Sequence, residues 1–400
     1  MGYDLARLRR ISDRVAVVGI GETDYARDYE ATRQARQAGQ DESGAPDSYA
    51  LGAIALQRAL ADCALAKTDI DGLAVGGPIS HQRLCESLGI SPIWGAEGPV
   101  DQLIPQAAQA IASGACTTVA LVYGNQQRGA GPRAASGGGP DQPLSTHYYH
   151  PWGWSSQGAI YAMMFKAHQL RYGSTEEQLG TVSRTIRDHA ALNDNAIMRT
   201  PITEGDYENA RYICRPLKIY DYCMVNDGGA ALILTTRERA ADLPKPPVLV
   251  SGFGRSSSNT GAPPLSDRIF DLHQHVLHAA GTQCFEMAEM APVDVDHFQT
   301  YDAFSIHLPL NLEGFGFCGP GEGLAYVQEG RIAIGGELPC NTGGGMLAES
   351  SVQGWNHQVE AVRQLRHDAG KRQVEDARTS MFGHHGAAGA FSIMYRRGDR

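Results

Sequence analysis

A tyrosine followed by an aspartate, Tyr301-Asp302, is the pair of residues in this chain best suited to acid–base chemistry. A phenol beside a carboxylate can donate a proton, accept one, or hold the oxyanion of a reaction intermediate. A structural role is equally compatible with the pair, in which a buried tyrosine has its hydroxyl satisfied by Asp302. We take both residues as candidate catalytic residues and leave the two interpretations open.

The residues around this pair indicate which elements hold it. Val293 and Val295 alternate with polar residues as in a strand, and Phe304, Leu308 and Leu312 follow with the spacing of a helix. The pair therefore lies at the end of a predicted strand. Ligands of open α/β sheets usually bind at such ends.

Composition narrows the class of protein. Hydrophobic residues make up 42% of the 400 residues and charged residues 20%, enough apolar material for a large core. The formal charge of −10 argues against nucleic acid or an anionic membrane as the partner. No apolar run reaches the roughly 18 residues of a membrane span, and no signal peptide is recognisable. The sequence predicts a soluble protein in the cytoplasm.

The eight cysteines are scattered singly along the chain. Their spacing contains no Cys-x-x-Cys pair and no set of metal ligands, so we expect reduced, mostly buried thiols and no metal site. They are Cys63, Cys85, Cys116, Cys214, Cys223, Cys284, Cys318 and Cys340.

Short apolar runs alternate with helical patterns in the first part of the chain, which predicts a parallel sheet with helices on its faces. A polar stretch over 32–44 predicts a loop. From about 127 to 225 this alternation is interrupted, and we interpret that segment as an inserted lobe. The predicted strands are 15–21, 69–75, 117–123 and 231–234, and the predicted helices are 48–64, 102–113, 159–172 and 175–193.

The chain contains a short internal repeat, called the sequence echo below. The fragment 66–73 resembles 291–298, and the glycine turn after the first strand returns in the strand 248–254, at an offset of about 225 residues. The pattern predicts two duplicated α/β halves, 1–245 (with the inserted lobe) and 246–400. In the second half we expect a helix from about 352 to 369. Two last strands, 377–382 and 390–395, should flank a glycine-rich turn.

Three motifs resemble those of the thiolase superfamily. They are Asn226-Asp227-Gly228-Gly229-Ala230, Tyr301-Asp302-Ala303-Phe304 in the place of an Asn-Glu-Ala-Phe motif, and Asn341-Thr342-Gly343-Gly344-Gly345. The resemblance implies an α/β thiolase fold, with duplicated halves stacked in five layers, α-β-α-β-α. It also implies that Asn341, Gly344 and Gly345 bind the substrate.

The catalytic residues of a thiolase are missing from the aligned positions. The nucleophilic cysteine falls near Glu97, the histidine of the Gly-His-Pro element falls at Ser351, and the second cysteine falls near Met381. Thiolysis needs an activated thiolate, so ordinary thiolase chemistry is not expected. Glu97 is either a solvated loop carboxylate or part of the site, and we place it among the substrate-binding candidates.

Two other departures resemble the lipid-transfer-type relatives, such as the thiolase half of sterol carrier protein X. They are Tyr-Asp-x-Phe in place of Asn-Glu-Ala-Phe, and Gln353-Gly354-Trp355-Asn356-His357 after the glycine loop. That group includes steroid side-chain aldolases, which cleave a β-hydroxyacyl-CoA by a retro-aldol step with the help of a small OB-fold, zinc-ribbon partner. Their chemistry is assigned to two tyrosines. The first matches Tyr301, whereas the second falls at Ser351, which is too short and too weak an acid to replace it.

The resemblance therefore implies an aldolase that acts on a steroid- or lipid-derived acyl-CoA. Glu349, Ser351, His384 and His385 complete the candidate catalytic set, since a histidine titrates near neutral pH. His384 and His385 are also compatible with capping backbone groups in a glycine-rich turn. No covalently bound cofactor is expected, because coenzyme A enters as part of the substrate.

The expected assembly is a homodimer bearing two OB-fold, zinc-ribbon chains, which makes a heterotetramer. Two other functions stay open at this point. One is a catalytically silent subunit for acyl-CoA binding or lipid transfer. The other is a non-standard thiolase or acyltransferase that uses a relocated Cys85.

Overall fold

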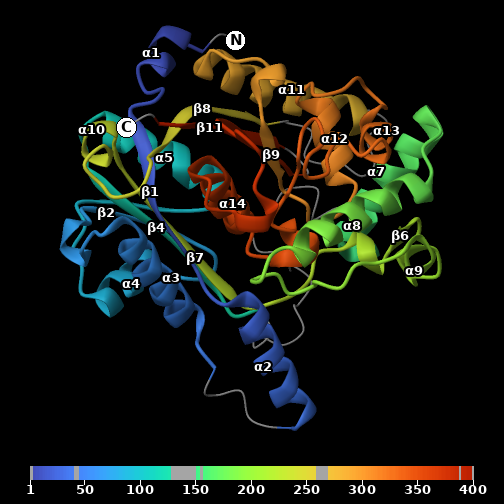
Figure 1. The fold of residues 1–400 in the computed structure, drawn as a ribbon, viewed down its shortest axis with the longest axis horizontal. Helices are drawn as coiled ribbons and strands as arrows, with labels where there is room; N and C mark the ends of the chain where they lie inside the picture. The colour runs from blue at the N-terminus through green and yellow to red at the C-terminus, as the bar shows by residue number, and fades with distance from the viewer. Residues whose placement is uncertain are drawn as a thin grey trace.

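The computed structural model describes residues 3–39, 45–127, 150–153, 156–257, 269–386 and 389–398. Its main feature is a nine-stranded sheet with the order β3-β2-β4-β7-β1-β8-β11-β10-β9 (Figure 1). The strands of the first half are β1 (Val15–Glu22), β2 (Gly72–Gly76), β3 (Trp94–Glu97), β4 (Thr118–Asn125) and β7 (Gly228–Thr236). Those of the second half are β8 (Val248–Ser257), β9 (His297–Thr300), β10 (Thr379–Gly386) and β11 (Gly389–Arg397).

The two halves repeat one strand order. The run β2-β4-β7-β1 in the first half has the counterpart β9-β10-β11-β8 in the second, and in each run the first pair is parallel and the later pairs are antiparallel. The predicted parallel pairing is therefore present only in β3-β2-β4 and β9-β10, and the sheet as a whole is mixed. Strand β7 runs antiparallel to both of its neighbours, β4 and β1, and β11 runs antiparallel to β10 and β8. The apolar periodicity of a strand gives no information about the direction in which the strand runs.

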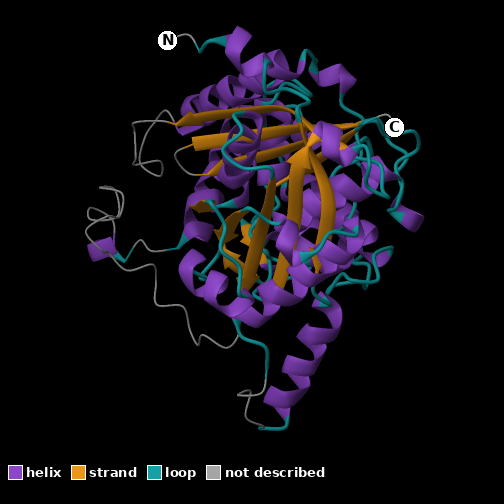
Figure 2. Cartoon of the chain, turned by 90° about the vertical axis from the view of Figure 1, so that its left-hand side faces the viewer, coloured by secondary structure: helices purple, strands orange, loops and turns teal. Residues whose placement is uncertain are grey.

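The halves are joined rather than separate. Strands β1 and β8 pair through Ala16–Leu249 and Val17–Val248. These pairs connect the strands of the two halves into one hydrogen-bonded sheet, whereas we expected two stacked sheets. In Figure 2 the strands of the upper and lower parts run at a steep angle to each other. The junction is short because the twist of the two halves separates the strands beyond these pairs.

The sequence echo corresponds to a repeated clamp. The Asp71 carboxylate accepts hydrogen bonds from the backbone N–H groups of Thr117 and Thr118, at the start of β4. Asp296 accepts from the backbone N–H groups at 378 and 379 in the same way, at the start of β10. One carboxylate in each half thus fixes where its neighbouring parallel strand begins.

The helices build three buried cores on the faces of the sheet. In the central core, α5 (Val100–Ala112) and α14 (Trp355–Arg366) pack with strands of both halves. In a second core, α3 (Ser48–Cys63) covers the outer face of the first half beside α4 (His81–Leu88). The third core contains α11 (Ile269–Ala288), α12 (His307–Gly314) and α13 (Gly323–Gln328) from the second half.

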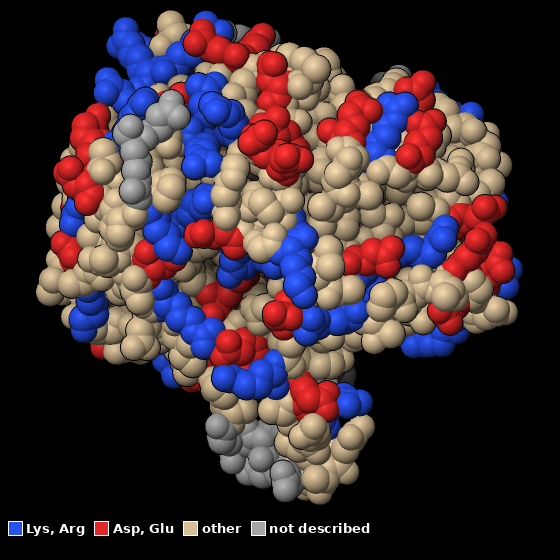
Figure 3. All heavy atoms as spheres, in the orientation of Figure 1, with Lys and Arg blue, Asp and Glu red and all other residues tan. Residues whose placement is uncertain are grey.

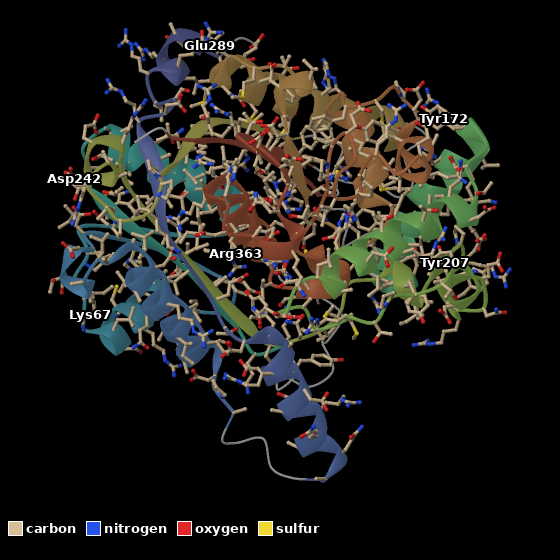
Figure 4. The ribbon with its side chains drawn as sticks, viewed as in Figure 1. Lys67, Tyr172, Tyr207, Asp242, Glu289 and Arg363 are labelled. Carbon is tan, nitrogen blue, oxygen red and sulfur yellow. The ribbon has the colours of Figure 1, made fainter. Side chains whose placement is uncertain are left out.

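Helix α14 is also held to the first half by charge. Arg363 lies near the centre of the view in Figure 4, and its guanidinium lies 2.7 Å from the Glu22 carboxylate at the end of β1. Glu22 is 4% exposed, and its charge contributes to raising the pKa of Arg363. This contact places the central helix firmly between the two halves.

The inserted segment adds two helices to the third core. Helices α7 (Gln157–Tyr172) and α8 (Glu176–Ala191) lie close to the predicted bounds, and their apolar faces pack beside α11 and α12. Much of the segment's first part, 128–149, lies outside the described residues. Shorter elements of the described chain include α1 (Leu5–Arg9), α9 (Glu204–Glu208), α10 (Arg237–Ala240), β5 (Tyr212–Cys214) and β6 (Leu217–Lys218).

Two local predictions are wrong. Residues 32–37 belong to α2 (Tyr25–Gln37), which projects at the bottom of Figure 1, and 40–44 lie outside the described residues. His384 and His385 lie inside β10 rather than in a turn. Gly383 and Gly386, which suggested the turn, pair instead with Ser392 and Gly389 of β11.

The face shown in Figure 3 carries interspersed acidic and basic side chains, with basic ones most concentrated around α1 at the upper left. Among the described residues, none of the helices is both long and apolar enough to cross a membrane.

Candidate active site

A cavity of about 670 Å³ opens where β2, β3 and β4 end. These three strands are mutually parallel, so their carboxyl ends meet at one edge of the sheet, the usual place for a ligand in such folds. The lining residues are Val75, Gly77, Pro78, Ile79, Glu97, Gly98, Pro99, Tyr123, Asn125, Gln127, Gln157, Tyr301, Gln353 and Trp355.

Tyr301 reaches this cavity from the end of β9. Its backbone N–H donates to Gly383 O at 2.9 Å, which keeps it beside β10, and its hydroxyl donates to Gln353 Oε1 at 3.2 Å. Burial is the main reason that the pKa of Tyr301 lies well above that of an ordinary phenol. Tyr301 is therefore a neutral phenol near pH 7, suited to donating a proton or a hydrogen bond.

Asp302 does not contact the Tyr301 hydroxyl. Its carboxylate is completely buried, where Oδ1 accepts a hydrogen bond from Met346 N at 2.7 Å and lies 3.1 Å from His357 Nε2. The interpretation in which Asp302 satisfies the Tyr301 hydroxyl is wrong, because the Asp302 carboxylate is directed to Met346 and His357 instead. Gln353 takes that place instead.

The glycine loop after Asn341 holds Asp302 and the end of β9 rather than lining the cavity. Asn341 Oδ1 accepts from Thr300 N at 2.7 Å, and its Nδ2 donates to Thr300 O at 2.9 Å. Gly345 has a φ of +55°, and a Cβ there would collide with the Asp302 carboxylate. Gly344 is buried against Ala190. Within the described residues, these three positions support the site from behind.

His384 lies directly against Tyr301. The two rings are stacked, with centroids 4.1 Å apart and planes 27° apart. The Nδ1 atom of His384 is hydrogen-bonded to the carboxylate of Asp101 in the first turn of α5. Asp101 is 4% exposed. A carboxylate, an imidazole and a phenol thus lie in sequence, and the phenol lines the cavity.

His385 occupies the other face of β10. Its side chain is 3% exposed, and its ring centroid lies 6.3 Å from that of His307 on α12. Successive residues of a strand point to opposite faces, so only one of the two histidines can reach Tyr301. His384 is that one.

Ser351 and Glu349 are buried below the cavity. Ser351 donates its backbone N–H to Asn226 Oδ1 at 2.7 Å, and its side chain does not line the cavity. Glu349 accepts hydrogen bonds from the amides of Asn193 and Asn356, at 2.8 and 2.9 Å. Burial, and then the nearby Glu22 and Glu360, raise the pKa of Glu349 well above its usual range.

Glu97 lines the cavity from the sheet edge, as a substrate-binding candidate should. Its carboxylate also accepts a hydrogen bond from the backbone N–H of His81 at 2.7 Å, at the first residue of α4. The residue is exposed and its charge caps a helix start. It therefore has a structural contact as well as access to a ligand.

The thiols offer no activated nucleophile at this place. All eight cysteines are free, and burial raises the pKa of Cys85 and raises that of Cys116 to about 11. A thiol with a raised pKa carries little thiolate near pH 7. Across the part of the chain that the structure describes, no group of three or more potential metal ligands is found.

Sequence reasoning missed two residues of the site, Asp101 and Gln353. Asp101 lies only four positions after Glu97, and its signal was a carboxylate immediately before the predicted helix 102–113. Gln353 had a signal in the motif that follows the glycine loop, but its contact with Tyr301 spans 52 positions in the chain. No pattern of neighbouring residues in the sequence marks the contact of Asp101 with His384 or the contact of Gln353 with Tyr301.

The second half of the chain matches a known protein family. Residues 265–395 match a family model described as "Thiolase C-terminal domain-like". This range contains β9, β10 and α14, and with them Tyr301 and His384.

Individual relatives cover nearly the whole chain. A steroid side-chain-cleaving aldolase of Thermomonospora curvata is 31% identical over 378 residues, which are 88% of this chain and 90% of that protein. A 17-hydroxy-3-oxo-4-pregnene-20-carboxyl-CoA lyase of Mycobacterium tuberculosis is 30% identical over 381 residues, 89% of this chain and 92% of that protein. The solved structure of an Ltp2–ChsH2(DUF35) aldolase matches with a TM-score of 0.86 at 28% identity, covering 98% of this chain and 99% of that one.

Proposed function

The chain belongs to the thiolase superfamily, in its sterol-carrier-protein or lipid-transfer branch, and we propose that it is a carbon–carbon lyase that cleaves a β-hydroxyacyl-CoA by a retro-aldol reaction. The observation that carries this proposal is the neutral phenol of Tyr301 in a cavity wall, stacked on His384. Its relatives include a steroid side-chain-cleaving aldolase and a carboxyl-CoA lyase, which supports the reaction class and a CoA thioester as substrate.

Retro-aldol cleavage needs two groups in the protein. One takes the proton of the β-hydroxyl, and the other stabilises the enolate of the departing thioester. Tyr301 suits the second task, because a phenol whose pKa is raised by burial keeps its proton and can donate a hydrogen bond to the enolate oxygen. Its hydroxyl donates to Gln353 in the free cavity and would turn from that amide to the substrate.

His384 suits the first task. Ser351, at the position of the second tyrosine of the aldolases, is buried and does not line the cavity. His384 instead brings an imidazole to the same phenol from the neighbouring strand. For Asp302, His385 and Glu349 we propose supporting roles, because each is almost completely buried, whereas the side chain of His384 keeps 18% exposure.

The absence of a cysteine at Glu97 agrees with a reaction that needs no acyl-enzyme. We propose that the chain works without the thiolase nucleophile, with coenzyme A entering only as part of the substrate. Glu97 and the amides of Asn125, Gln127 and Gln157 line the cavity, and we propose that they contact the bound thioester. The acyl group itself would be steroid- or lipid-derived, as in the named relatives.

The proposed assembly is a homodimer that carries an OB-fold, zinc-ribbon partner. The structural relative is an Ltp2–ChsH2(DUF35) aldolase, and the ChsH2(DUF35) component of its name supports such a partner. Strand β3 is an edge of the sheet, and Ile93 just before it is 77% exposed, which supports pairing between two copies at this edge. Size-exclusion chromatography with light scattering on the co-expressed chains would measure the stoichiometry.

The test of the function is cleavage of β-hydroxyacyl-CoA thioesters by the full chain with its partner, beside Tyr301→Phe. We expect release of a ketone or aldehyde, and a kcat lowered about 100-fold or more in the variant because the phenol proton is gone. Equal rates in both proteins would remove Tyr301 from the chemistry. Tight binding of thioesters without any cleavage, across acyl groups that the relatives accept, would show a binding subunit instead.

A further inference from the structure

We propose that Asp101 positions His384 so that the Nε2 atom of His384 takes the proton of the substrate's β-hydroxyl group. This inference rests on the proposed retro-aldol function and assigns a residue that neither the sequence motifs nor the family comparison singled out. It stands on three observations: the contact between the two side chains, the burial of Asp101, and the stacking of His384 on Tyr301.

The contact fixes which nitrogen of His384 carries the hydrogen. An ionised carboxylate can only accept hydrogen bonds, so the bond between Asp101 Oδ2 and His384 Nδ1 places the hydrogen on Nδ1. The lone pair is then on Nε2. Among the described residues, Nε2 has no hydrogen-bond partner, and the side chain of His384 keeps 18% exposure. An imidazole in this state is ready to accept a proton.

Asp101 lies in the first turn of α5, two residues after Pro99, where the helix dipole interacts favourably with negative charge. The other oxygen, Oδ1, is buried and has no hydrogen-bond partner within the described residues. Among those residues, His384 is thus the hydrogen-bond partner of this carboxylate, which is the arrangement that a positioning residue requires.

The neighbours of His384 come from three elements. Tyr301 follows β9 and covers one ring face, and Phe391 of β11 lies 5.8 Å away. Beyond Phe391, the guanidinium of Arg255 on β8 lies 5.2 Å from the Phe391 ring centroid. The charged or titratable groups around His384 in the described chain are therefore Asp101, Tyr301 and, at longer range, Arg255.

The proposed step is balanced in protons and electrons. His384 Nε2 takes the hydroxyl proton, the oxygen's electron pair forms the new carbonyl bond, and the bond between the α- and β-carbons breaks. Its electron pair passes to the α-carbon as the thioester enolate, whose oxygen accepts a hydrogen bond from Tyr301. The α-carbon then receives one proton, and His384 returns one proton to the solvent, which leaves a ketone or aldehyde and a shorter acyl-CoA.

The decisive variant is Asp101→Asn, which keeps the size of the side chain and removes its charge. In Ser-His-Asp triads this exchange lowers kcat about 10⁴-fold because the imidazole adopts the wrong tautomer. We expect a loss of at least about 100-fold in kcat with KM changed less than about threefold, since the group acts after binding. We also expect the acid limb of the kcat profile to move, because the base loses its carboxylate.

A matched control is available in the same chain. Glu313 forms a buried pair with His168 at 3.0 Å, in the third core and outside the cavity. Glu313→Gln removes a carboxylate from a buried histidine just as Asp101→Asn does, but it should leave kcat per folded molecule unchanged. Equal losses in both variants would mean a structural effect and would overturn the proposal, as would a kcat for Asp101→Asn within about threefold of the parent.

A second measurement does not depend on turnover. The ring nitrogens of His384 can be observed by NMR in protein labelled with ¹⁵N-histidine, with assignment from His384→Gln. We expect Nδ1 protonated and Nε2 bare in the parent, and a changed pattern in Asp101→Asn. The opposite tautomer in the parent overturns this inference while leaving the proposed function standing. Conversely, the expected tautomer in a protein that cleaves no thioester would count against the function alone.

Discussion

The ring of Tyr301 lies on the ring of His384, with 4.1 Å between centroids, because Tyr301 follows the last residue of β9 at the level of His384 within the parallel strand β10. Thr300 of β9 is in register with Gly383 of β10, so the residues that follow them, Tyr301 and His384, lie side by side. The stack is thus a direct product of strand register. It places an imidazole directly against the phenol that lines the cavity.

Gln353 should control the orientation of the Tyr301 hydroxyl. Replacing it by methionine keeps the length of the side chain and removes the oxygen that accepts the phenol proton. We expect kcat to fall about fivefold, since one neutral hydrogen bond contributes about 1 kcal/mol. The matched variant Gln157→Met changes the cavity wall elsewhere and should alter KM rather than kcat. Steady-state kinetics would separate the two, and a pure KM effect for Gln353→Met would contradict the assignment.

Gly345 should be needed for the packing of Asp302. Gly345→Ala adds a Cβ that meets a buried carboxylate at a φ of +55°, and we expect a loss of about 3 kcal/mol or more in the free energy of unfolding. Gly370→Ala is the control, because Gly370 has a φ of +61° and no atom within 4 Å of an added Cβ. It should cost only about 1 kcal/mol. Urea denaturation would measure both, and equal losses would show that backbone strain alone matters.

His297 should make the protein less stable below neutral pH. Burial lowers its pKa to about 4, from an unfolded value of 6.5. Between these values the unfolded chain binds a proton and the folded chain does not, so stability is complete above about pH 6.5 and is lost as the pH falls toward 4. The full loss is about 3 kcal/mol for this one group.

The contribution of His297 can be isolated by difference, because Glu349 acts in the opposite sense. The raised pKa of Glu349 means that its folded state holds a proton that the unfolded state releases, which favours the folded protein as pH falls. We therefore compare the unfolding free energy of the parent and His297→Gln at pH 7 and pH 5. The gap between them should narrow at pH 5. A gap that is constant with pH would mean that His297 is not neutral in the folded state.

Cys85 should be dispensable for catalysis. Its pKa is raised by burial, and the nearest imidazole nitrogen of His81 lies 3.8 Å from the sulfur. Cys85→Ala should therefore retain kcat and KM within about twofold, whereas a relocated thiolate nucleophile would make it inactive. Mass spectrometry of the protein during turnover, with no acyl adduct at any cysteine, would give the same answer by a second route.

Much of the fold could be predicted from the sequence because its signals are local. The apolar runs at 15–21 and 248–254 and the helical spacing at 48–64 correspond to β1, β8 and α3. The echo of 66–73 in 291–298 marks the two carboxylate clamps at Asp71 and Asp296. Strand direction and the β1–β8 junction could not be predicted, since hydrogen bonding between distant strands leaves no local pattern. The division at residue 245 stays a prediction.

The sequence by itself determined which residues are available for chemistry: a tyrosine at a predicted strand end, two adjacent histidines and eight scattered cysteines. It also led to the family, through motifs that are continuous in the chain. Only the tertiary structure decided which of these residues meet. The register of β9 with β10 brings Tyr301 to His384 and sends His385 to the opposite face, and the packing of α5 supplies Asp101 from 283 positions away. Such pairings depend on the relative placement of whole elements, which is set by burial of their apolar faces and not by any residue's neighbours in the sequence.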